Sequence, residues 1–471
     1  NDQFRFNADT SYNYQNKNLT VQWKHVFSNN LYAVISGIYS GYNYNISSYQ
    51  NETNAFTLDY SIDNYGLKLD FSWYPFPNHK IDFGLNSLAY RLNPGRFQPS
   101  GELSLITPEL LENEQGIESA IYIGDKFDIS NKLSIYAGLR YSFYSFLGPK
   151  SVNEYAPGEP IEDETKTGET SYDKNESIIN YQGLEPRFSA RYSLNDFNSI
   201  KISYNRMRQY IQMLSNTTSI SPTDIWKLSD RFIKPQIGDQ FTLGYYRNFR
   251  NNTIETSVEA YYKNINNLLD FKSGAELLMN EHIETDIVNG LGKSYGVEVL
   301  FKKKTGKLNG WVSYAYSRAL IKVDSGYEEE IINNGEFYPA NYDKPHAVNV
   351  LSNYRFSRRL SISGNIVYST GRPITIPLAK YSYYGSERLH YSERNEFRIP
   401  DYFRLDISLN IEGNHKVKKL NHSSWTIGVY NLTGRNNPYS VYFVSSNGEI
   451  NGYKLSIFAE PIPTVTYNFR F

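Results

Sequence analysis

The last eight residues of the chain alternate between apolar and polar side chains. The apolar positions are Val465, Tyr467, Phe469 and Phe471, and the positions between them are polar. Successive side chains of a strand point to opposite faces, so this segment is expected to be a strand with one apolar face. The same alternation recurs upstream, for example over 131–146, 239–249 and 400–411. Many runs are about 9–13 residues long, which suits a tilted strand that crosses a membrane.

Short and long connections between these runs alternate along most of the chain. Tight turns fall near 129–132 and 195–198, whereas long polar segments cover 147–182 and 371–399. A membrane barrel has short turns at one end and long loops at the other, and a soluble sandwich has no need of this alternation. We therefore predict an all-β fold, a transmembrane antiparallel β-barrel, with about 18 strands in this chain. The expected strands are 2–14, 18–27, 30–45, 55–74 (bulged near 63–65), 79–91, 115–128, 131–146, 183–194, 198–209, 239–249, 253–266, 293–304, 308–321, 344–355, 359–370, 400–411, 423–435 and 464–471.

Composition narrows the class further. The chain has 471 residues, a formal net charge of −1 and no cysteine, and its mean hydropathy is −0.56. No stretch approaches the roughly 18 apolar residues of a transmembrane helix. The charge balance provides no field that would attract nucleic acid, and the lack of cysteine excludes a disulfide scaffold. The 43 tyrosines fit a membrane barrel with aromatic interfaces, with a soluble β-rich protein as the alternative.

Six short motifs follow one another in the second half of the chain. They are KPQ at 234–236, SYGVEV at 294–299, TGRP at 370–373, RLDISL at 404–409, YNLTGR at 430–435 and PTVTYNFRF at 463–471. In this order they resemble motifs of the TonB-dependent outer-membrane transporters, especially those of Bacteroidota. YNLTGR resembles the Asn-Leu-Phe-Asn end of that family's penultimate strand, and PTVTYNFRF resembles its terminal strand. Each motif is degenerate, but six in the same order are much more specific.

The resemblance implies a barrel of about 22 strands that is closed by an N-terminal plug. An energised TonB complex would pull on the plug through a short TonB box, so that a scarce nutrient passes. This chain contains no recognisable plug or TonB box, and it starts at Asn1 without a signal peptide. We therefore expect residues 1–471 to form a single outer-membrane β-barrel domain. The plug and the first four strands would belong to a missing N-terminal part.

Charged residues at polar strand positions are candidates for the lumen. They are Arg140, Arg404, Asp406 and Arg470. Lumen side chains tune selectivity in membrane barrels, so some of these residues are expected to line the substrate route. The alternative is that they only satisfy one another in a polar lumen.

Aromatic residues gather in two of the long loops. They are Tyr381, Tyr383, Tyr384 and Tyr391 in one loop, and Tyr439, Tyr442 and Phe443 in the other. Exposed rings suit sugar stacking, peptide binding or a partner lipoprotein, with loop-on-loop packing as the alternative. In the terminal strand, the resemblance assigns Val465, Tyr467, Phe469 and Phe471 to the signal that the barrel-assembly machinery reads.

No motif indicates catalysis, a metal or another cofactor. The seven histidines show no metal-ligand spacing. GKSYG at 292–296 matches Gly-x-Ser-x-Gly, but it leads into an alternating strand pattern and not into the helix that a nucleophile elbow requires. A catalytic group assembled only in space stays open. We predict that the protein is not an enzyme.

Three functions are compatible with these patterns. The leading one is a TonB-dependent receptor that imports a scarce nutrient, such as a siderophore, a glycan or a peptide, through a gated barrel. The second is a passive porin of about 18 strands. The third is a barrel scaffold in a larger outer-membrane complex with surface lipoproteins. The expected location is the bacterial outer membrane, crossed many times. The expected partners are outer-membrane lipid, the TonB complex through a plug outside this chain, and a surface lipoprotein, but no nucleic acid.

Overall fold

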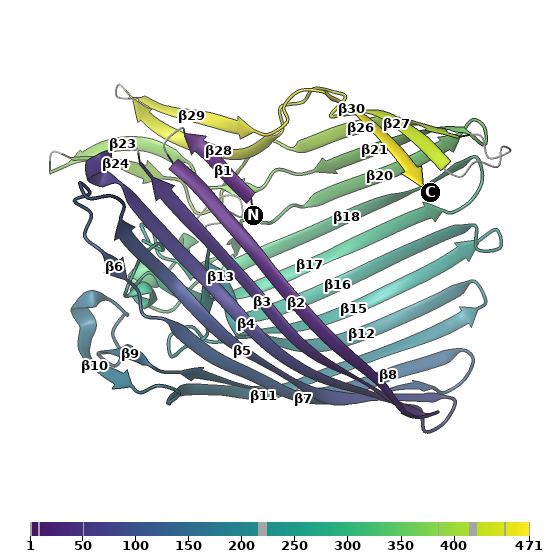
Figure 1. The fold of residues 1–471 in the computed structure, drawn as a ribbon, viewed down its shortest axis with the longest axis horizontal. Helices are drawn as coiled ribbons and strands as arrows, with labels where there is room; N and C mark the ends of the chain where they lie inside the picture. The colour runs from purple at the N-terminus through teal and green to yellow at the C-terminus, as the bar shows by residue number, and fades with distance from the viewer. Residues whose placement is uncertain are drawn as a thin grey trace.

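One large antiparallel sheet accounts for most of the chain and curls into a wide cylinder (Figure 1). The computed structural model describes residues 2–7, 10–49, 51–214, 224–384, 386–413, 422–446 and 449–470. For 2–7, 386, 387, 422, 445, 446 and 470 it describes the backbone alone.

Twenty hydrogen-bonded strands form this sheet, and three of them are short: β1 (Asp2–Asn7), β6 (Glu109–Leu110) and β19 (Tyr338–Pro339). The other seventeen are β2 (Thr10–Ser28), β3 (Leu31–Ser48), β4 (Phe56–Trp73), β5 (His79–Pro99), β7 (Glu114–Asp128), β8 (Leu133–Leu147), β11 (Ser177–Asn195), β12 (Asn198–Gln209), β15 (Gln236–Phe249), β16 (Ile254–Phe271), β17 (Ile287–Lys303), β18 (Leu308–Lys322), β20 (His346–Arg355), β21 (Leu360–Ser369), β26 (Tyr402–Glu412), β27 (His422–Tyr430) and β30 (Ile462–Arg470).

The long strands form an up-and-down meander. Each one pairs antiparallel with the long strand before it and the long strand after it, from β2 to β30. Within the described part of the chain, no ladder joins β30 to β1 or β2. The short strand β1 pairs with β2 from Thr10 to Tyr14, so the rest of β2 and strand β30 are the two edges at which the cylinder is open.

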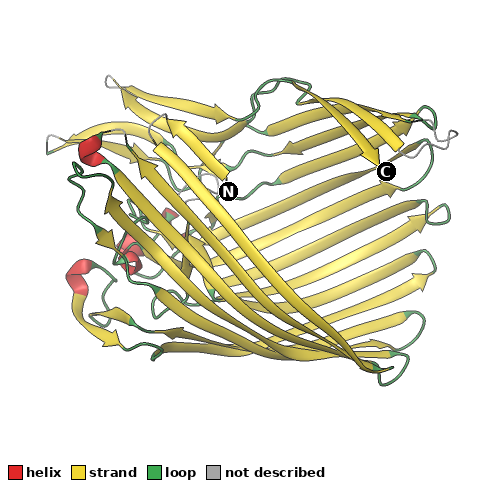
Figure 2. Ribbon diagram, in the orientation of Figure 1, coloured by secondary structure: helices red, strands yellow, loops and turns green. Residues whose placement is uncertain are grey.

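Small hairpins and short 3-10 helices gather at one end of the cylinder, and short turns close the other end (Figure 2). The hairpins pair β9 (Lys150–Tyr155) with β10 (Lys166–Tyr172), β13 (Ile211–Leu214) with β14 (Ile225–Leu228), β22 (Pro373–Ile374) with β25 (Phe397–Arg398), β23 (Pro377–Tyr383) with β24 (Ser386–Tyr391), and β28 (Pro438–Ser446) with β29 (Glu449–Ser456). The 3-10 helices are η1 (Glu52–Asn54), η2 (Asp163–Thr165), η3 (Ile283–Thr285), η4 (Glu328–Glu330) and η5 (Asn333–Gly335). Among the residues with described coordinates, no helix has the length and apolar character needed to cross a membrane.

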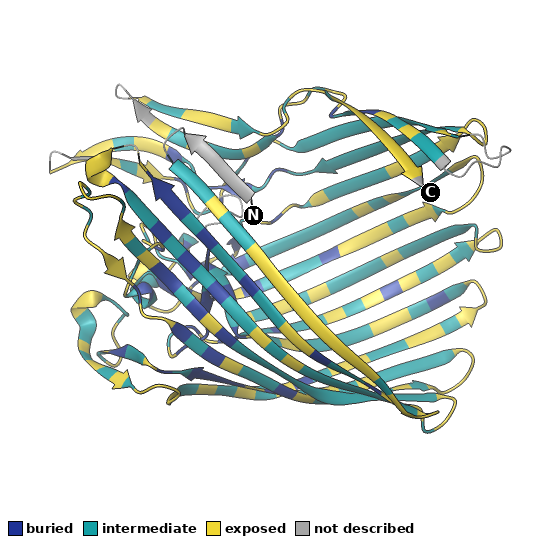
Figure 3. Cartoon of the chain, viewed as in Figure 1, coloured by how far each residue is buried: buried dark blue, intermediate teal, exposed yellow. Residues whose placement is uncertain are grey.

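Large apolar side chains cover the outer surface of the cylinder. In β15, Phe241 and Leu243 are each 55% exposed, although both are large and apolar. The residues between and beside them, Thr242 and Gly244, occupy the opposite face. Exposed and more buried positions alternate along many strands of the sheet (Figure 3). An exposed apolar belt around a cylinder is the pattern expected of a barrel surrounded by lipid.

Strand β4 exchanges the polarity of its two faces near its middle. Toward the short turn, its outward residues are apolar, namely Tyr65, Leu67, Leu69, Phe71 and Trp73. Toward the loops, the opposite face becomes apolar, with Leu58, Tyr60 and Ile62 buried in a core that includes loop residues. Along β4, the outward face is therefore apolar in the half near the short turn, and the inward face packs against loop residues in the half near the loops.

This exchange explains one error in the predicted strands. The bulge expected near 63–65 is absent there, because β4 pairs with β3 in one register from Phe56 to Trp73. The irregularity lies between Asp59 and Ser61, against β5. A change of environment along one regular strand shifted the apolar positions from one face to the other, and this shift imitated a bulge.

The first two predicted strands, 2–14 and 18–27, are also wrong. The turn expected around 15–17 does not exist, because β2 runs unbroken for 19 residues and pairs with β3 throughout. The polar run at 13–18 (NYQNKN) continues the strand, since ladder pairing needs only backbone groups. The predicted turns at 129–132 and 195–198 are confirmed by the gaps between β7 and β8 and between β11 and β12.

Candidate functional site

The described residues between β12 and β15, 210–214 and 224–235, fold into the cylinder instead of projecting away from it. Its strands β13 and β14, which we call the lumenal hairpin, contact the inner wall. The Tyr60 hydroxyl of β4 donates to the Trp226 carbonyl at 3.3 Å and accepts from the Trp226 amide at 3.0 Å. The Tyr144 hydroxyl of β8 donates to the Ser229 carbonyl at 2.9 Å. Wall tyrosines therefore satisfy backbone groups that burial of a loop would otherwise leave unpaired.

Apolar packing attaches the lumenal hairpin to opposite parts of the wall. Leu214 and Ile225 of the hairpin lie in one core with Tyr44 of β3 and Tyr60 of β4. The same core includes Leu277, Ile283 and Ile287, which precede or begin β17. A second core joins Leu228 to residues of β5 and β8, including Tyr90, Tyr144 and Phe146. These contacts fill part of the lumen at the loop end.

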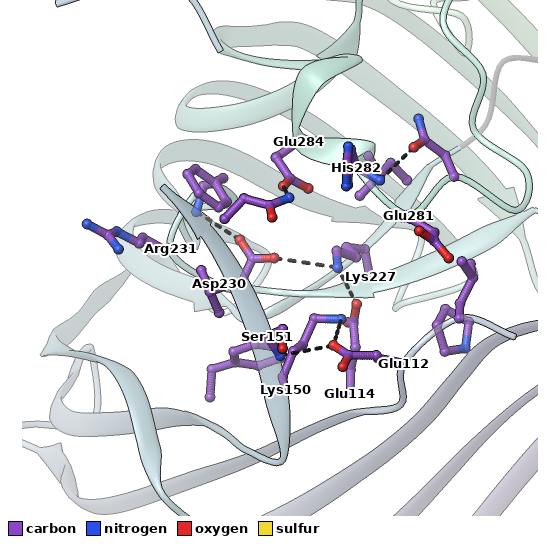
Figure 4. A pocket seen from close by; sticks show the side chains of 18 of the residues that line it. Glu112, Glu114, Lys150, Ser151, Lys227, Asp230, Arg231, Glu281, His282 and Glu284 are labelled. Carbon is purple, nitrogen blue, oxygen red and sulfur yellow. Dashed lines mark hydrogen bonds and ion pairs between the residues drawn. The ribbon is translucent and has the colours of Figure 1, made fainter. Parts of the chain in front are cut away.

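A buried ion pair reinforces this attachment (Figure 4). Lys227 of the hairpin contacts Glu114, the first residue of β7, and its Nζ lies 3.5 Å from Asp230 Oδ2. The Lys227 and Glu114 side chains are only 8% and 1% exposed. The Leu228 amide also donates to Glu114 Oε2, at 3.3 Å. The carboxylate thus has an ammonium partner and a backbone partner, as a buried charge requires.

The surroundings of Lys227 keep its ammonium charged. Burial alone would lower the pKa of Lys227, but the carboxylates of Glu114 and Asp230 outweigh burial and raise its pKa above the ordinary lysine value. Nearby Lys150 is different: burial, and then the like charge of Lys227, lower its pKa, although its Nζ lies 3.8 Å from Glu112 Oε2. The charges in this cluster are therefore mostly compensated by one another.

A cavity of about 280 Å³ lies beside this ion pair. Charged groups of both signs line it, including Glu112, Lys150, Arg231, His282 and Glu284. Within the described ranges, no group of three or more His, Asp, Glu or Cys side chains is arranged to hold a metal ion. The lining combines these groups with apolar side chains such as Leu111, Phe146 and Ile225, and Lys227, Glu114, Lys150 and Glu112 are paired within the wall and the loops.

Arg140, the first lumen candidate, is tied to its neighbours on the wall. Its Nη2 donates to Glu118 Oε1 at 3.1 Å, and its Nε lies 3.7 Å from Glu185 Oε1. Glu118 also accepts from the Tyr90 hydroxyl at 3.0 Å. The guanidinium therefore links β7, β8 and β11, which is the arrangement expected of a residue that satisfies a polar lumen.

Arg404 and Asp406, two further candidates, lie together on the inner face of β26. Arg404 Nε donates to Asp406 Oδ2 at 3.0 Å, and Arg404 Nη1 donates to the Tyr430 hydroxyl at 2.6 Å. Asp406 Oδ1 accepts from the Asn431 amide at 2.9 Å. The last candidate, Arg470, ends β30, and its side chain lies outside the described residues.

A second cavity, of about 580 Å³, opens above Arg404 toward the loops. Its wall combines cations with rings and amides: Lys344, Arg372, Arg404, Tyr402, Tyr430, Tyr439, Phe458, Asn431 and Asn437. The structure thus brings the lumen candidate Arg404 and the loop candidate Tyr439 to one site. Lys344 and Arg372 were not predicted from the sequence as site residues. Lys344 begins the expected strand 344–355 but precedes β20 in the structure, and Arg372 belongs to the TGRP motif, which was noted for its family resemblance alone.

The other loop aromatics lie on two separate hairpins. Tyr381, Tyr383, Tyr384 and Tyr391 are exposed on β23–β24, with Tyr384 93% exposed. On β28, Tyr442 is exposed and stacks on Tyr453 of β29 at 5.5 Å between ring centroids, and Phe443 is half-buried. The predicted binding role of these rings stays a prediction.

The terminal strand presents its apolar residues outward. Val465, Tyr467 and Phe469 are 65%, 48% and 55% exposed, and Phe471 lies outside the described residues. Their predicted role as an assembly signal stays a prediction.

Sequence reasoning missed the residues that anchor the lumenal hairpin. Glu114 and Lys227 are 113 positions apart, so no local pattern connects them. The face exchange of β4 was the available signal, because apolar Leu58, Tyr60 and Ile62 on an otherwise polar inner face require something to pack against them.

An outward apolar belt, an up-and-down antiparallel sheet and loops packed into the lumen define a membrane-spanning β-barrel. The family described as "TonB dependent receptor-like, beta-barrel" matches residues 1–432. The chain belongs to this family, which confirms the predicted fold class and the resemblance to TonB-dependent transporters, whereas the resemblance to the Bacteroidota members stays a prediction. A search of curated proteins found no match.

Solved structures of outer-membrane receptors share the fold. The closed form of the ferric-catecholate import receptor Fiu from Escherichia coli K12 has a TM-score of 0.59 at 13% identity, with 98% of this chain and 65% of the receptor covered. The ferric preacinetobactin receptor BauA from Acinetobacter baumannii has a TM-score of 0.60 at 13% identity, with 98% of this chain and 64% of the receptor covered. The pyoverdine receptor FpvA from Pseudomonas aeruginosa PAO1 has a TM-score of 0.62 at 12% identity, with 97% of this chain and 62% of the receptor covered. The chain thus spans just under two thirds of these receptors, all of which are receptors and not enzymes.

Proposed function

We propose that this chain is the barrel part of a TonB-dependent receptor that imports a scarce nutrient across the bacterial outer membrane. The family match over residues 1–432 carries the proposal. The filled lumen supports it, since a gated importer needs a route that is closed at rest. A passive porin has less support, because the lumenal hairpin is buried in two cores and held by an ion pair.

The proposed protein includes parts outside this chain. The edge of β2 beyond its pairing with β1, and the edge of β30, leave ladder groups unpaired, and a membrane barrel must pair them. We propose that further strands close this opening and that a plug couples the barrel to TonB. The length of the solved receptors supports this arrangement. We also propose a surface lipoprotein as a partner, because the tyrosines of the β23–β24 hairpin are exposed.

The names of the similar receptors favour a ferric chelate as the first cargo to test. Deletion of the gene is expected to slow growth when iron is limited with dipyridyl and to reduce uptake of radioactive iron from siderophore-containing spent medium. Complementation with the intact gene should restore both, and a protonophore should abolish the uptake.

Two results would contradict the proposal at different points. Uptake that persists in the presence of the protonophore would indicate passive passage and not TonB-dependent import. Equal growth of deletion and parent strains on limiting iron, glycans and peptides alike would contradict nutrient import altogether.

A further inference from the structure

The cavity above Arg404 has an unbalanced charge. Lys344, Arg372 and Arg404 line it, and none of its described lining residues is Asp or Glu. Of these cations, Arg404 has a carboxylate partner, Asp406. The cavity beside Lys227 is different, because carboxylates of Glu112, Glu114 and Asp230 accompany its lysines. The upper cavity therefore carries positive charge that its own lining does not neutralise.

Keeping Lys344 and Arg372 charged inside this cavity costs electrostatic free energy. Burial, and then the like charge of Arg372, lower the pKa of Lys344. Burial likewise lowers the pKa of Arg372, whose Nη2 donates to the Tyr439 carbonyl at 2.7 Å. Two interacting cations without an acid between them are costly, and an anion placed beside them would remove the cost.

Aromatic rings make up much of the remaining wall. Tyr430 lies beneath the guanidinium of Arg404, with 4.4 Å between Arg404 Cζ and the ring centroid. Phe458 meets Tyr430 edge to face at 6.1 Å and remains 62% exposed. Tyr439 is exposed as well. Solvent-exposed rings such as that of Phe458 offer a stacking surface to a flat organic group.

We propose that this cavity is a binding site for an organic anion that carries a flat ring, as part of the imported cargo. Lys344 and Arg372 contact its anionic oxygens, and Tyr439 and Phe458 contact its ring. A volume of about 580 Å³ lies within the range of small-molecule sites. The proposal rests on the proposed import function for its role, but the binding step does not require energy coupling.

The test uses the full-length receptor, purified in detergent, and pyranine, a fluorescent pyrene that carries three sulfonates. Fluorescence anisotropy measures its binding to the parent protein and to Lys344→Met with Arg372→Gln. These substitutions remove both charges, while methionine keeps the approximate length of the lysine side chain and glutamine keeps an amide donor. The matched control is Lys307→Met with Arg358→Gln, which removes two exposed cations at the short turns. Heat-modifiable migration on a gel verifies that each barrel is folded.

The cavity variant is expected to bind pyranine about tenfold more weakly or worse, since each charge-assisted contact contributes substantially. The control variant should bind as the parent does. Tricarballylate, which has three carboxylates and no ring, should compete at least about tenfold more weakly than 1,3,6-naphthalenetrisulfonate, a flat trisulfonate that does not fluoresce at the wavelengths of pyranine, given the missing ring contacts. Parent binding should weaken as salt rises.

The proposal is overturned if the folded cavity variant binds as tightly as the parent, or if both variants lose affinity equally. Equal competition by tricarballylate would show that the ring does not contribute to binding, which contradicts that part of the proposal. Because binding is measured without cells, intact pyranine binding together with unchanged nutrient uptake in the deletion strain would instead contradict the proposed function alone.

Discussion

Replacing Lys227 with methionine is expected to destabilise the folded barrel by roughly 3–5 kcal/mol. The substitution leaves the Glu114 carboxylate buried without its ammonium partner, at a position where that side chain is only 1% exposed. Removing one member of a buried pair costs more than removing both, because the remaining charge has lost its compensation. The free energy of unfolding from guanidinium titration in lipid vesicles measures the effect.

Two comparisons distinguish the ion pair from a general loss of packing. Adding Glu114→Gln to Lys227→Met should restore most of the lost free energy, while exposed Lys307→Met should change it by less than about 0.5 kcal/mol. If Lys227→Met is as stable as the parent, the lumenal hairpin is not held by this contact.

The pH dependence of the same variant follows from the raised pKa of Lys227. A raised pKa in the folded state gives a contribution that is fully present below the ordinary lysine value of about 10.4 and is lost only as pH rises through the higher folded value. In Lys227→Met the unpaired Glu114 carboxyl can itself take up a proton as pH falls, so the contribution of Lys227 is read from the double variant Lys227→Met with Glu114→Gln. The free-energy difference between this double variant and the parent should be equal at about pH 6 and about pH 8. A difference that grows between these values would show that another group titrates.

Placing arginine at Leu243 is expected to cost about 2–4 kcal/mol, the penalty for a cation at the centre of the lipid face. Leu243 lies midway between Asp239 and Arg247 on the same strand parity, which are about 27 Å apart along an extended strand. The measurement is again unfolding in vesicles. Thr242→Arg, one residue away on the inner face, is the control and should cost less than about 1 kcal/mol. Equal costs at both positions would contradict the assignment of the outer face.

The alternation of apolar and polar residues correctly predicted those strands in which each face has one environment along its whole length. In β26, apolar Phe403, Leu405 and Ile407 alternate with Arg404 and Asp406, and the strand lies where the pattern placed it. In β4 the environment changes along the strand, so the same reasoning produced a false bulge. Alternation records what each face touches, and it locates a strand accurately only where that contact is uniform.

The site was predictable only in the residues that occupy strands. Arg404 was recognised from its polar position in an alternating strand, and Tyr439 from its place in an aromatic loop. Lys344 and Arg372 face the same cavity from connections, where no period indicates which way a side chain points. The Lys227–Glu114 contact depends on how a loop folds back across the barrel, which tertiary packing alone determines.

Cysteine labelling of whole cells can test whether this chain forms a barrel in the outer membrane with its long loops outside the cell. The chain has no cysteine, so single cysteines can be introduced by Tyr384→Cys in the β23–β24 loop and by Lys307→Cys in a short turn. The probe is a maleimide on a polyethylene glycol too large for porins, applied to intact and then to permeabilised cells. If the long loops lie outside the cell, Tyr384→Cys should be labelled on intact cells and Lys307→Cys only after permeabilisation. Labelling of Lys307→Cys on intact cells, or of neither variant until permeabilisation, would contradict it.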